Sequence, residues 1–260
     1  MSFAQVVLLS AIAGGTIFLG LPVGRLRNLT PKTQVALTAA AGGVILFLIW
    51  DILGQAVEPI ERTLNAAANG SGAVTDFVVL ALAGGGGIAL GLLSITWLTR
   101  RLRAAPDAPF DPNRVATATA IGLGLHNLSE GLAIGASAAT GATSLAFLLV
   151  IGFALHNATE GFGIAAPLAS GERPTWRFLG ILGLVGGGPT FLGGILGFSF
   201  TNDVLATLSL GLAAGALIYV FNEMTAVARR AASPMTTNIA ILIGLLAGFA
   251  TDMILGVAGG

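Results

Sequence analysis

The sequence predicts an all-α, polytopic membrane protein with eight transmembrane helices and both termini on the extracytoplasmic side. Its composition is the first observation: of 260 residues, 55% are apolar and only 9% are charged, and the mean hydropathy is +0.89. The second observation is a series of eight apolar segments, each close to the roughly 20 residues that a helix needs to cross a bilayer. The third is the placement of the basic residues in alternate loops. We expect one domain, covering residues 1–260.

The apolar segments follow one another with short connections. We expect helices at residues 4–21, 34–54, 77–99, 115–139, 142–169, 177–199, 203–228 and 236–257. No basic residue precedes the first segment, as one would in a signal peptide, so we expect it to be a retained helix. Residues 55–76 should form the longest extracytoplasmic loop. In the sixth segment, Pro189 should kink the helix and free a carbonyl near Val185.

The basic residues set the orientation of these helices. Eleven of the twelve lie in the loops that follow the first, third, fifth and seventh segments, and only Arg62 lies in an opposite loop. Loops rich in Lys and Arg stay in the cytoplasm, so both termini should lie outside. The arginines at 100–103 are explained by topology, and we expect no nucleic-acid partner. The chain has no cysteine, which excludes disulfides and thiolate metal ligands.

One polar motif occurs twice within the apolar segments. Leu-His-Asn-Leu-Ser-Glu-Gly begins at Leu125, and Leu-His-Asn-Ala-Thr-Glu-Gly begins at Leu155, thirty residues later. On a helix, positions i, i+1 and i+4 lie at about 0°, 100° and 40° around the axis, so the three polar side chains of each copy share a face. Because only a few residues connect the two segments, we expect antiparallel neighbours whose polar faces converge near the middle of the bilayer.

The two buried acids need a counter-charge. An ionised side chain at the centre of the bilayer costs roughly 3 kcal/mol on insertion scales, and no Lys or Arg occurs between Val115 and Leu168. The charge must therefore be met by protons or by a bound cation. Imidazole, carboxylate and amide oxygen together suit a divalent metal of borderline to hard character.

Three further polar residues lie near the ends of the predicted helices. Asp51 follows Trp50 at the end of the second segment, where it is either a solvated interfacial residue or part of the mouth of an ion pathway. Asn222 and Glu223 lie in the seventh segment, about two turns before Arg229. Glu223 therefore either extends to the interface or faces a pathway.

The repeat and the topology together resemble the ZIP (Zrt-, Irt-like) family of divalent metal transporters, of the bacterial or archaeal type. The resemblance rests on eight helices with external termini, a His-Asn-x-x-Glu-Gly motif in each of two consecutive helices, and the Asn222–Glu223 pair in the seventh. It implies that a transported metal is coordinated by the six residues of the repeat. These are His126, Asn127, Glu130, His156, Asn157 and Glu160.

The resemblance also implies a pathway past Asn222 and Glu223, and motion of the first, fourth, fifth and sixth helices as a block. The chain departs from the family where a second metal is often held, because Gly188 precedes Pro189 in place of a carboxylate. We therefore expect one principal metal, with a weaker second site left open. The proline usually found between Asn and Glu is replaced by Ser129 and Thr159, whose hydroxyls can bond back to the helix.

Our first functional hypothesis is an alternating-access carrier that admits Zn²⁺, or a similar cation such as Fe²⁺, Mn²⁺, Co²⁺ or Cd²⁺, across the inner cell membrane into the cytoplasm. We expect no catalytic residues and no resident cofactor. The partners are the metal as substrate and the lipid bilayer, with a homodimer left open. The alternative is a membrane metalloenzyme, although its usual Glu-x-x-His and His-Glu-x-x-His spacings are absent. A purely structural or receptor role would leave the buried acids unexplained.

Overall fold

The computed structural model describes residues 1–101, 111–200, 202–231 and 234–259. Within these residues the chain forms eight α-helices and no strand, which confirms the predicted all-α fold. The helices are α1 (Phe3–Gly15), α2 (Pro31–Ala68), α3 (Val74–Arg101), α4 (Pro112–Ala139), α5 (Thr143–Ala165), α6 (Trp176–Ser199), α7 (Asp203–Ala231) and α8 (Pro234–Gly259). Short 3₁₀ turns extend α1 over Thr16–Leu19 and Leu21–Arg25, and extend α5 over Ala166–Ser170.

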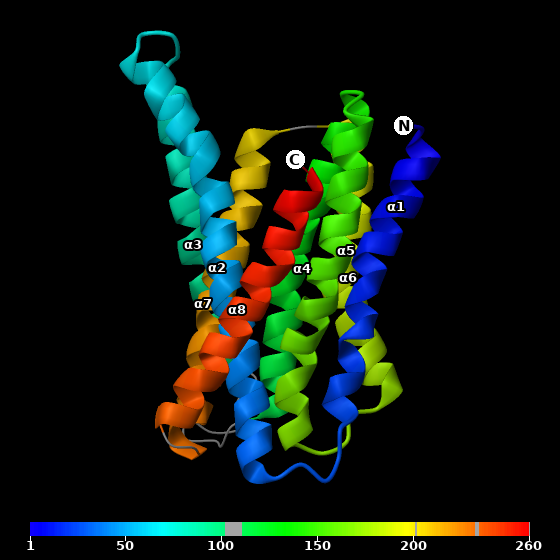
Figure 1. The fold of residues 1–260 in the computed structure, drawn as a ribbon. Helices are drawn as coiled ribbons and strands as arrows, with labels where there is room; N and C mark the ends of the chain where they lie inside the picture. The colour runs from blue at the N-terminus through cyan, green and yellow to red at the C-terminus, as the bar shows by residue number, and fades with distance from the viewer. Residues whose placement is uncertain (102–110, 201, 232–233, 260) are drawn as a thin grey trace.

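The helices run alternately up and down, so that both termini lie at the same end of the bundle (Figure 1). An even number of crossings requires this arrangement. The opposite end holds the beginnings of α2, α4, α6 and α8, next to the segments that carry most of the basic residues. We therefore refer to the end with the termini as the outer end, following the positive-inside rule.

The second helix differs from its prediction. α2 has 38 residues, Pro31–Ala68, which corresponds to about 57 Å at 1.5 Å per residue. Most of the expected outer loop is therefore helical, and α2 and α3 project past the other helices as a hairpin (Figure 1). The apolar pattern marks only the part of a helix inside the bilayer. The helix continues through Pro59 and ends before Gly70, which has a φ of 70°.

Six helical spans in the described residues are long and apolar enough to cross a membrane, and α8 contributes a shorter apolar stretch over Pro234–Ala250. The protein is thus a multi-pass membrane protein. α4 is less apolar than these spans because it carries the first polar motif. More than half of its residues are buried, so α4 is shielded from lipid by its neighbours and tolerates polar side chains.

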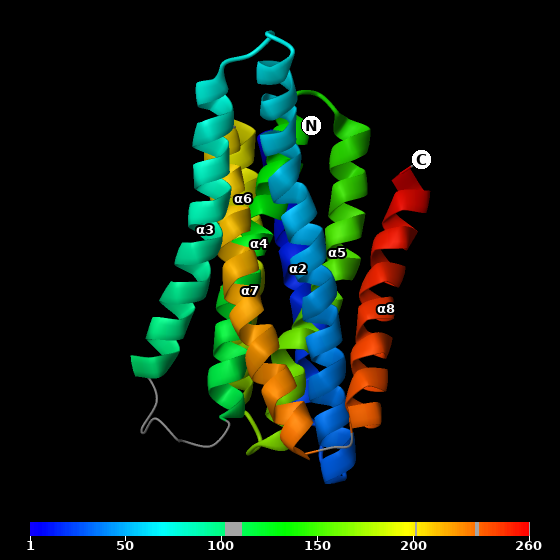
Figure 2. The ribbon, with the colours of Figure 1, turned by 90° about the vertical axis from the view of Figure 1, so that its left-hand side faces the viewer.

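The helices pack most closely in two groups. One group contains α1, α4, α5 and α6, with α6 packed along both α1 and α4. The other contains α2, α3, α7 and α8, in which α7 lies beside α3 and α2 (Figure 2). The groups meet mainly where α7 packs on α4 and where α8 packs on α5. Both helices that carry the repeated motif therefore belong to the same group.

Candidate metal site

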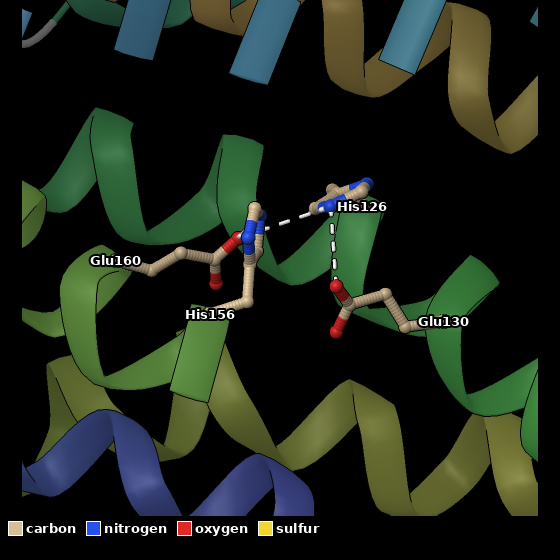
Figure 3. Close-up of side chains that lie close together, drawn as sticks. All are labelled: His126, Glu130, His156 and Glu160. Carbon is tan, nitrogen blue, oxygen red and sulfur yellow. Dashed lines mark ion pairs between the residues drawn. The ribbon is translucent and has the colours of Figure 1, made fainter. Parts of the chain in front are cut away.

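The two copies of the motif lie on antiparallel neighbours, as predicted. α4 and α5 are connected through Gly141, whose φ of 82° permits a tight turn. Their packing brings His126 and Glu130 of α4 next to His156 and Glu160 of α5, and the four side chains point toward one another (Figure 3).

Four donor atoms of these side chains form a compact cluster, all within 4.8 Å of one another. His126 Nε2 lies 3.4 Å from Glu130 Oε1 and 3.9 Å from Glu160 Oε1. His156 Nε2 lies 3.8 Å from Glu160 Oε1. Zinc bonds of about 2.0–2.2 Å place tetrahedral ligand atoms about 3.3–3.6 Å apart. Small side-chain movements would therefore let all four atoms bind one ion.

The cluster is buried and lacks a basic partner. Glu160 is fully buried and Glu130 is 3% exposed. Among the described residues, no Lys or Arg pairs with either carboxylate. Glu160 Oε1 and the Nε2 atoms of both histidines make no hydrogen bond. Buried polar atoms without partners are costly, so these atoms are suited to share a cation.

The two asparagines of the repeat bond to carboxylates of the opposite helix. Asn127 Nδ2 donates to Glu160 Oε2 at 2.8 Å and to the Gly186 carbonyl of α6 at 3.0 Å. Asn157 Nδ2 donates to Glu130 Oε2 at 3.4 Å and to the Ala13 carbonyl of α1 at 3.1 Å. The repeat thus produces two crossed amide–carboxylate contacts. The bond to Gly186 also uses a carbonyl beside the one that we expected Pro189 to free.

The hydroxyl before each glutamate behaves alike in the two copies. Ser129 Oγ donates to the His126 carbonyl at 2.5 Å, and Thr159 Oγ1 donates to the His156 carbonyl at 2.7 Å. These are the bonds to the helix backbone that the sequence suggested. The glycine after each glutamate admits a neighbouring element. A Cβ atom on Gly131 would collide with the Thr190 carbonyl, and one on Gly161 with the Ile17 carbonyl.

Asp51 lies on α2 beside the cluster. One turn earlier on α2, the Phe47 ring packs edge-on against His156, with ring centroids 6.2 Å apart. Asp51 Oδ2 accepts a hydrogen bond of 2.8 Å from Gln55 Nε2. Asp51 is therefore close to the cluster without being one of its four converging groups.

Asn222 and Glu223 lie apart from the cluster, toward the inner end of α7. Asn222 is exposed. Glu223 Oε2 lies 3.5 Å from Nη2 of Arg114, whose side chain is 7% exposed. Arg114 precedes His126 by twelve residues on α4, or about 18 Å of helix rise. No pattern in the sequence indicated this ion pair, because Arg114 resembled the other basic residues of the cytoplasmic loops.

Gly188 provides no ligand, and its surroundings do not include the cluster. A Cβ atom there would meet nothing within 4 Å. Gly188 borders an apolar groove of about 240 Å³ between α1 and α6, lined also by Gly14, Phe18 and Leu184. This position on α6 therefore cannot supply a carboxylate for a second metal.

Comparison with known protein families identifies the chain. The family model described as ZIP zinc transporter matches residues 111–256, more than half of the sequence, including both copies of the motif. The chain belongs to the ZIP zinc transporter family. A search of curated proteins gave no match. ZIP proteins transport divalent metals and are not enzymes, so membership supports the transporter hypothesis over the metalloenzyme, and the buried His/Glu cluster fits a metal site.

Proposed function

We propose that this ZIP-family protein carries Zn²⁺, or a similar divalent transition-metal cation, across the inner cell membrane into the cytoplasm. The main support is the pair of buried carboxylates, Glu130 and Glu160, which have two imidazoles beside them and no Lys or Arg partner among the described residues. A divalent cation would neutralise both charges and bind the unpaired Nε2 atoms. Asn127 and Asn157 complete the site.

The packing of the helices supports alternating access as the mechanism. All six residues of the site lie on α4 and α5, which pack with α1 and α6 into one group. Movement of this group against α2, α3, α7 and α8 would carry the bound ion as part of a rigid body. The ion pair between Arg114 of α4 and Glu223 of α7 joins the two groups near the inner end, and it would have to break during such a movement.

A cavity at the outer end supports a route of entry. It has a volume of about 290 Å³ and lies between α2, α4, α6 and α7. Its walls include Glu58 and Asp203, and it extends to Ser129, which directly precedes Glu130. We propose that the cation enters from this side near Asp51, binds at the cluster and leaves past Asn222 and Glu223. A homodimer is the assembly we would test first, by chemical cross-linking in membranes.

Uptake of radioactive zinc into proteoliposomes tests the proposal. We expect the wild type to accumulate zinc and the double variant Glu130→Ala/Glu160→Ala to show only background uptake. The matched control is Glu61→Ala/Asp76→Ala, which removes two exposed acids from the α2–α3 hairpin and should retain uptake. Uptake that survives loss of both buried glutamates would refute the assignment of the site.

A further inference from the structure

Four arginines lie at the inner end of the bundle, where α1 ends and α6 begins (Figure 1). Arg25 and Arg27 follow α1, Arg173 lies just before α6, and Arg177 lies in the first turn of α6. We call these four residues the basic cluster. None of them forms an ion pair with a carboxylate of another described residue. With Glu172 as their only acid, residues 25–27 and 171–177 carry a net charge of +3.

Two of these arginines are attached to the beginning of α6. Arg25 Nη1 donates to the Pro174 carbonyl, 149 positions along the chain, and Arg27 Nη1 donates to the Gly171 carbonyl at 3.4 Å. The Arg25 guanidinium also stacks on the Trp176 ring, 4.4 Å from its centroid. The positive-inside rule explains why cytoplasmic loops carry arginine. It does not require that arginines of two distant loops be held together, so this convergence of like charges needs a further explanation.

The chemistry of the basic cluster suits a phosphate group. A guanidinium has five N–H donors and no acceptor. Arg25 and Arg27 each donate through one nitrogen to a carbonyl of a described residue, and their other donors can serve a ligand. Guanidinium groups bind phosphate oxygens strongly, often through two parallel hydrogen bonds. A phosphate would also offset the mutual repulsion of the arginines.

An apolar groove lies between the same two helices. Its volume is about 240 Å³, and its lining includes Gly15, Phe18, Leu184 and Gly188. A Cβ atom on Gly15 or Gly188 would meet nothing within 4 Å, so the absence of side chains leaves the groove open. Phe18 is 40% exposed and Leu184 is 66% exposed. In a membrane these surfaces face hydrocarbon, so an acyl chain is the natural occupant of the groove.

The groove and the basic cluster lie along one face of α6. Trp176, Gly180, Leu184 and Gly187 are separated by four, four and three residues, which is the spacing of one helical face. Leu184 follows Trp176 by eight residues, or about 12 Å of helix rise. Half of the hydrocarbon core is about 15 Å deep. A phospholipid with its phosphate at the basic cluster can therefore place an acyl chain in the groove.

We propose that the inner ends of α1 and α6 bind an anionic phospholipid of the inner leaflet, with its phosphate at the basic cluster and an acyl chain in the groove. Basic pockets between transmembrane helices on the cytoplasmic side bind acidic headgroups in this way. Trp176, which is 62% exposed, lies between the two parts, as tryptophans do at a membrane interface. A free phosphate would leave the groove unfilled. Because α1 and α6 pack with the helices of the metal site, the lipid would attach that group of helices to the inner leaflet.

Fluorescence quenching by brominated lipids tests the site in the full-length protein without metal. The variant Trp50→Phe/Trp97→Phe keeps Trp176 as its single tryptophan. In phosphatidylcholine vesicles, brominated phosphatidylglycerol should quench Trp176 at a mole fraction about 30-fold lower than brominated phosphatidylcholine does. Equal quenching by the two lipids would overturn the proposal. Native mass spectrometry of the wild type, which should retain phosphatidylglycerol, gives the same comparison if the variant does not fold.

Substitutions in the basic cluster test the headgroup contact. Arg173→Gln/Arg177→Gln removes two exposed charges and should weaken phosphatidylglycerol binding about 25-fold, since each arginine near an anionic surface contributes roughly fivefold. The matched control is Arg100→Gln/Arg229→Gln, which removes two exposed charges from the inner ends of α3 and α7 and should have little effect. Equal effects of the two double variants would reduce the site to general surface charge and refute it.

A larger side chain in the groove tests the acyl-chain contact. Gly188→Leu should weaken phosphatidylglycerol binding several-fold. Gly85→Leu is the control, because a Cβ atom at Gly85 also has open space but lies on α3, and it should leave binding unchanged. Inorganic phosphate identifies the other possible source of the anion. If it relieves the quenching better than chloride at equal ionic strength, or if Gly188→Leu has no effect, the site takes a free anion and the lipid proposal is wrong.

Discussion

Replacing a buried glutamate with glutamine should stabilise the metal-free protein while abolishing its response to zinc. Glu130 and Glu160 present oxygens within 4.8 Å of each other. At an effective dielectric constant of about 20, two full charges at that separation repel by roughly 3–4 kcal/mol. Glu160→Gln removes this repulsion and keeps a carbonyl oxygen that can accept the Asn127 bond. In the absence of metal and above neutral pH, we expect this substitution to raise the free energy of unfolding by up to about 3 kcal/mol.

Thermal unfolding in detergent, followed by the fluorescence of the three tryptophans, measures this effect. With a chelator present, Glu160→Gln should unfold about 5–10 °C above the wild type. The gain should shrink at lower pH, because the repulsion requires both carboxylates to be ionised. Added zinc should raise the midpoint of the wild type by mass action and leave that of the variant unchanged. The exposed acid Glu61 provides the control. Glu61→Gln should change neither the unfolding midpoint of the metal-free protein nor the rise of that midpoint on adding zinc.

Two results would refute this reasoning. If Glu160→Gln lowers the metal-free midpoint by several degrees, the carboxylate is stabilised in the metal-free protein and does not need a cation. If the variant still responds to zinc as the wild type does, the ion binds elsewhere.

Three further predictions follow from other parts of the structure. Zinc binding measured by calorimetry should weaken steeply below roughly pH 6, because protons compete for the imidazole and carboxylate ligands, and a flat pH profile would argue against these ligands. Gly131→Ala should destabilise the protein by about 1–3 kcal/mol in chemical unfolding, since its Cβ would collide with α6, whereas Gly188→Ala has open space and should be neutral; equal effects would contradict the packing. Glu223→Gln should slow uptake several-fold in proteoliposomes and leave equilibrium zinc affinity unchanged, because Glu223 pairs with Arg114 far from the cluster; a loss of affinity would place it in the binding site.

Much of the site could be predicted because it depends on local periodicity. The spacing of His126 and Glu130, repeated at His156 and Glu160, places each pair on one helical face whatever the rest of the chain does. The short connection through Gly141 then leaves antiparallel packing as the simple arrangement. The sequence also shows directly that no Lys or Arg lies near the repeat. Among the described residues, no Lys or Arg from elsewhere in the chain pairs with either carboxylate.

Other features left no trace in the sequence pattern. The extension of α2 to Ala68 lies where the apolar signal stops, since helical propensity continues after hydrophobicity ends. The Arg114–Glu223 pair joins residues 109 positions apart on two separate helices. The carbonyls of Ala13 and Gly186 belong to the backbone, which every residue has, so no residue type marks them as partners of the asparagines.

By itself the sequence determined a bundle of apolar helices with two matched sets of imidazole, amide and carboxylate groups, because composition and helical repeat act over neighbouring residues. Only the tertiary structure decided which oxygen of each carboxylate faces the histidines and which amide bonds to which acid. That choice depends on how α4 and α5 are rotated and on the contacts of α1 and α6 behind them. Such contacts connect distant parts of the chain, and packing of the whole bundle sets them.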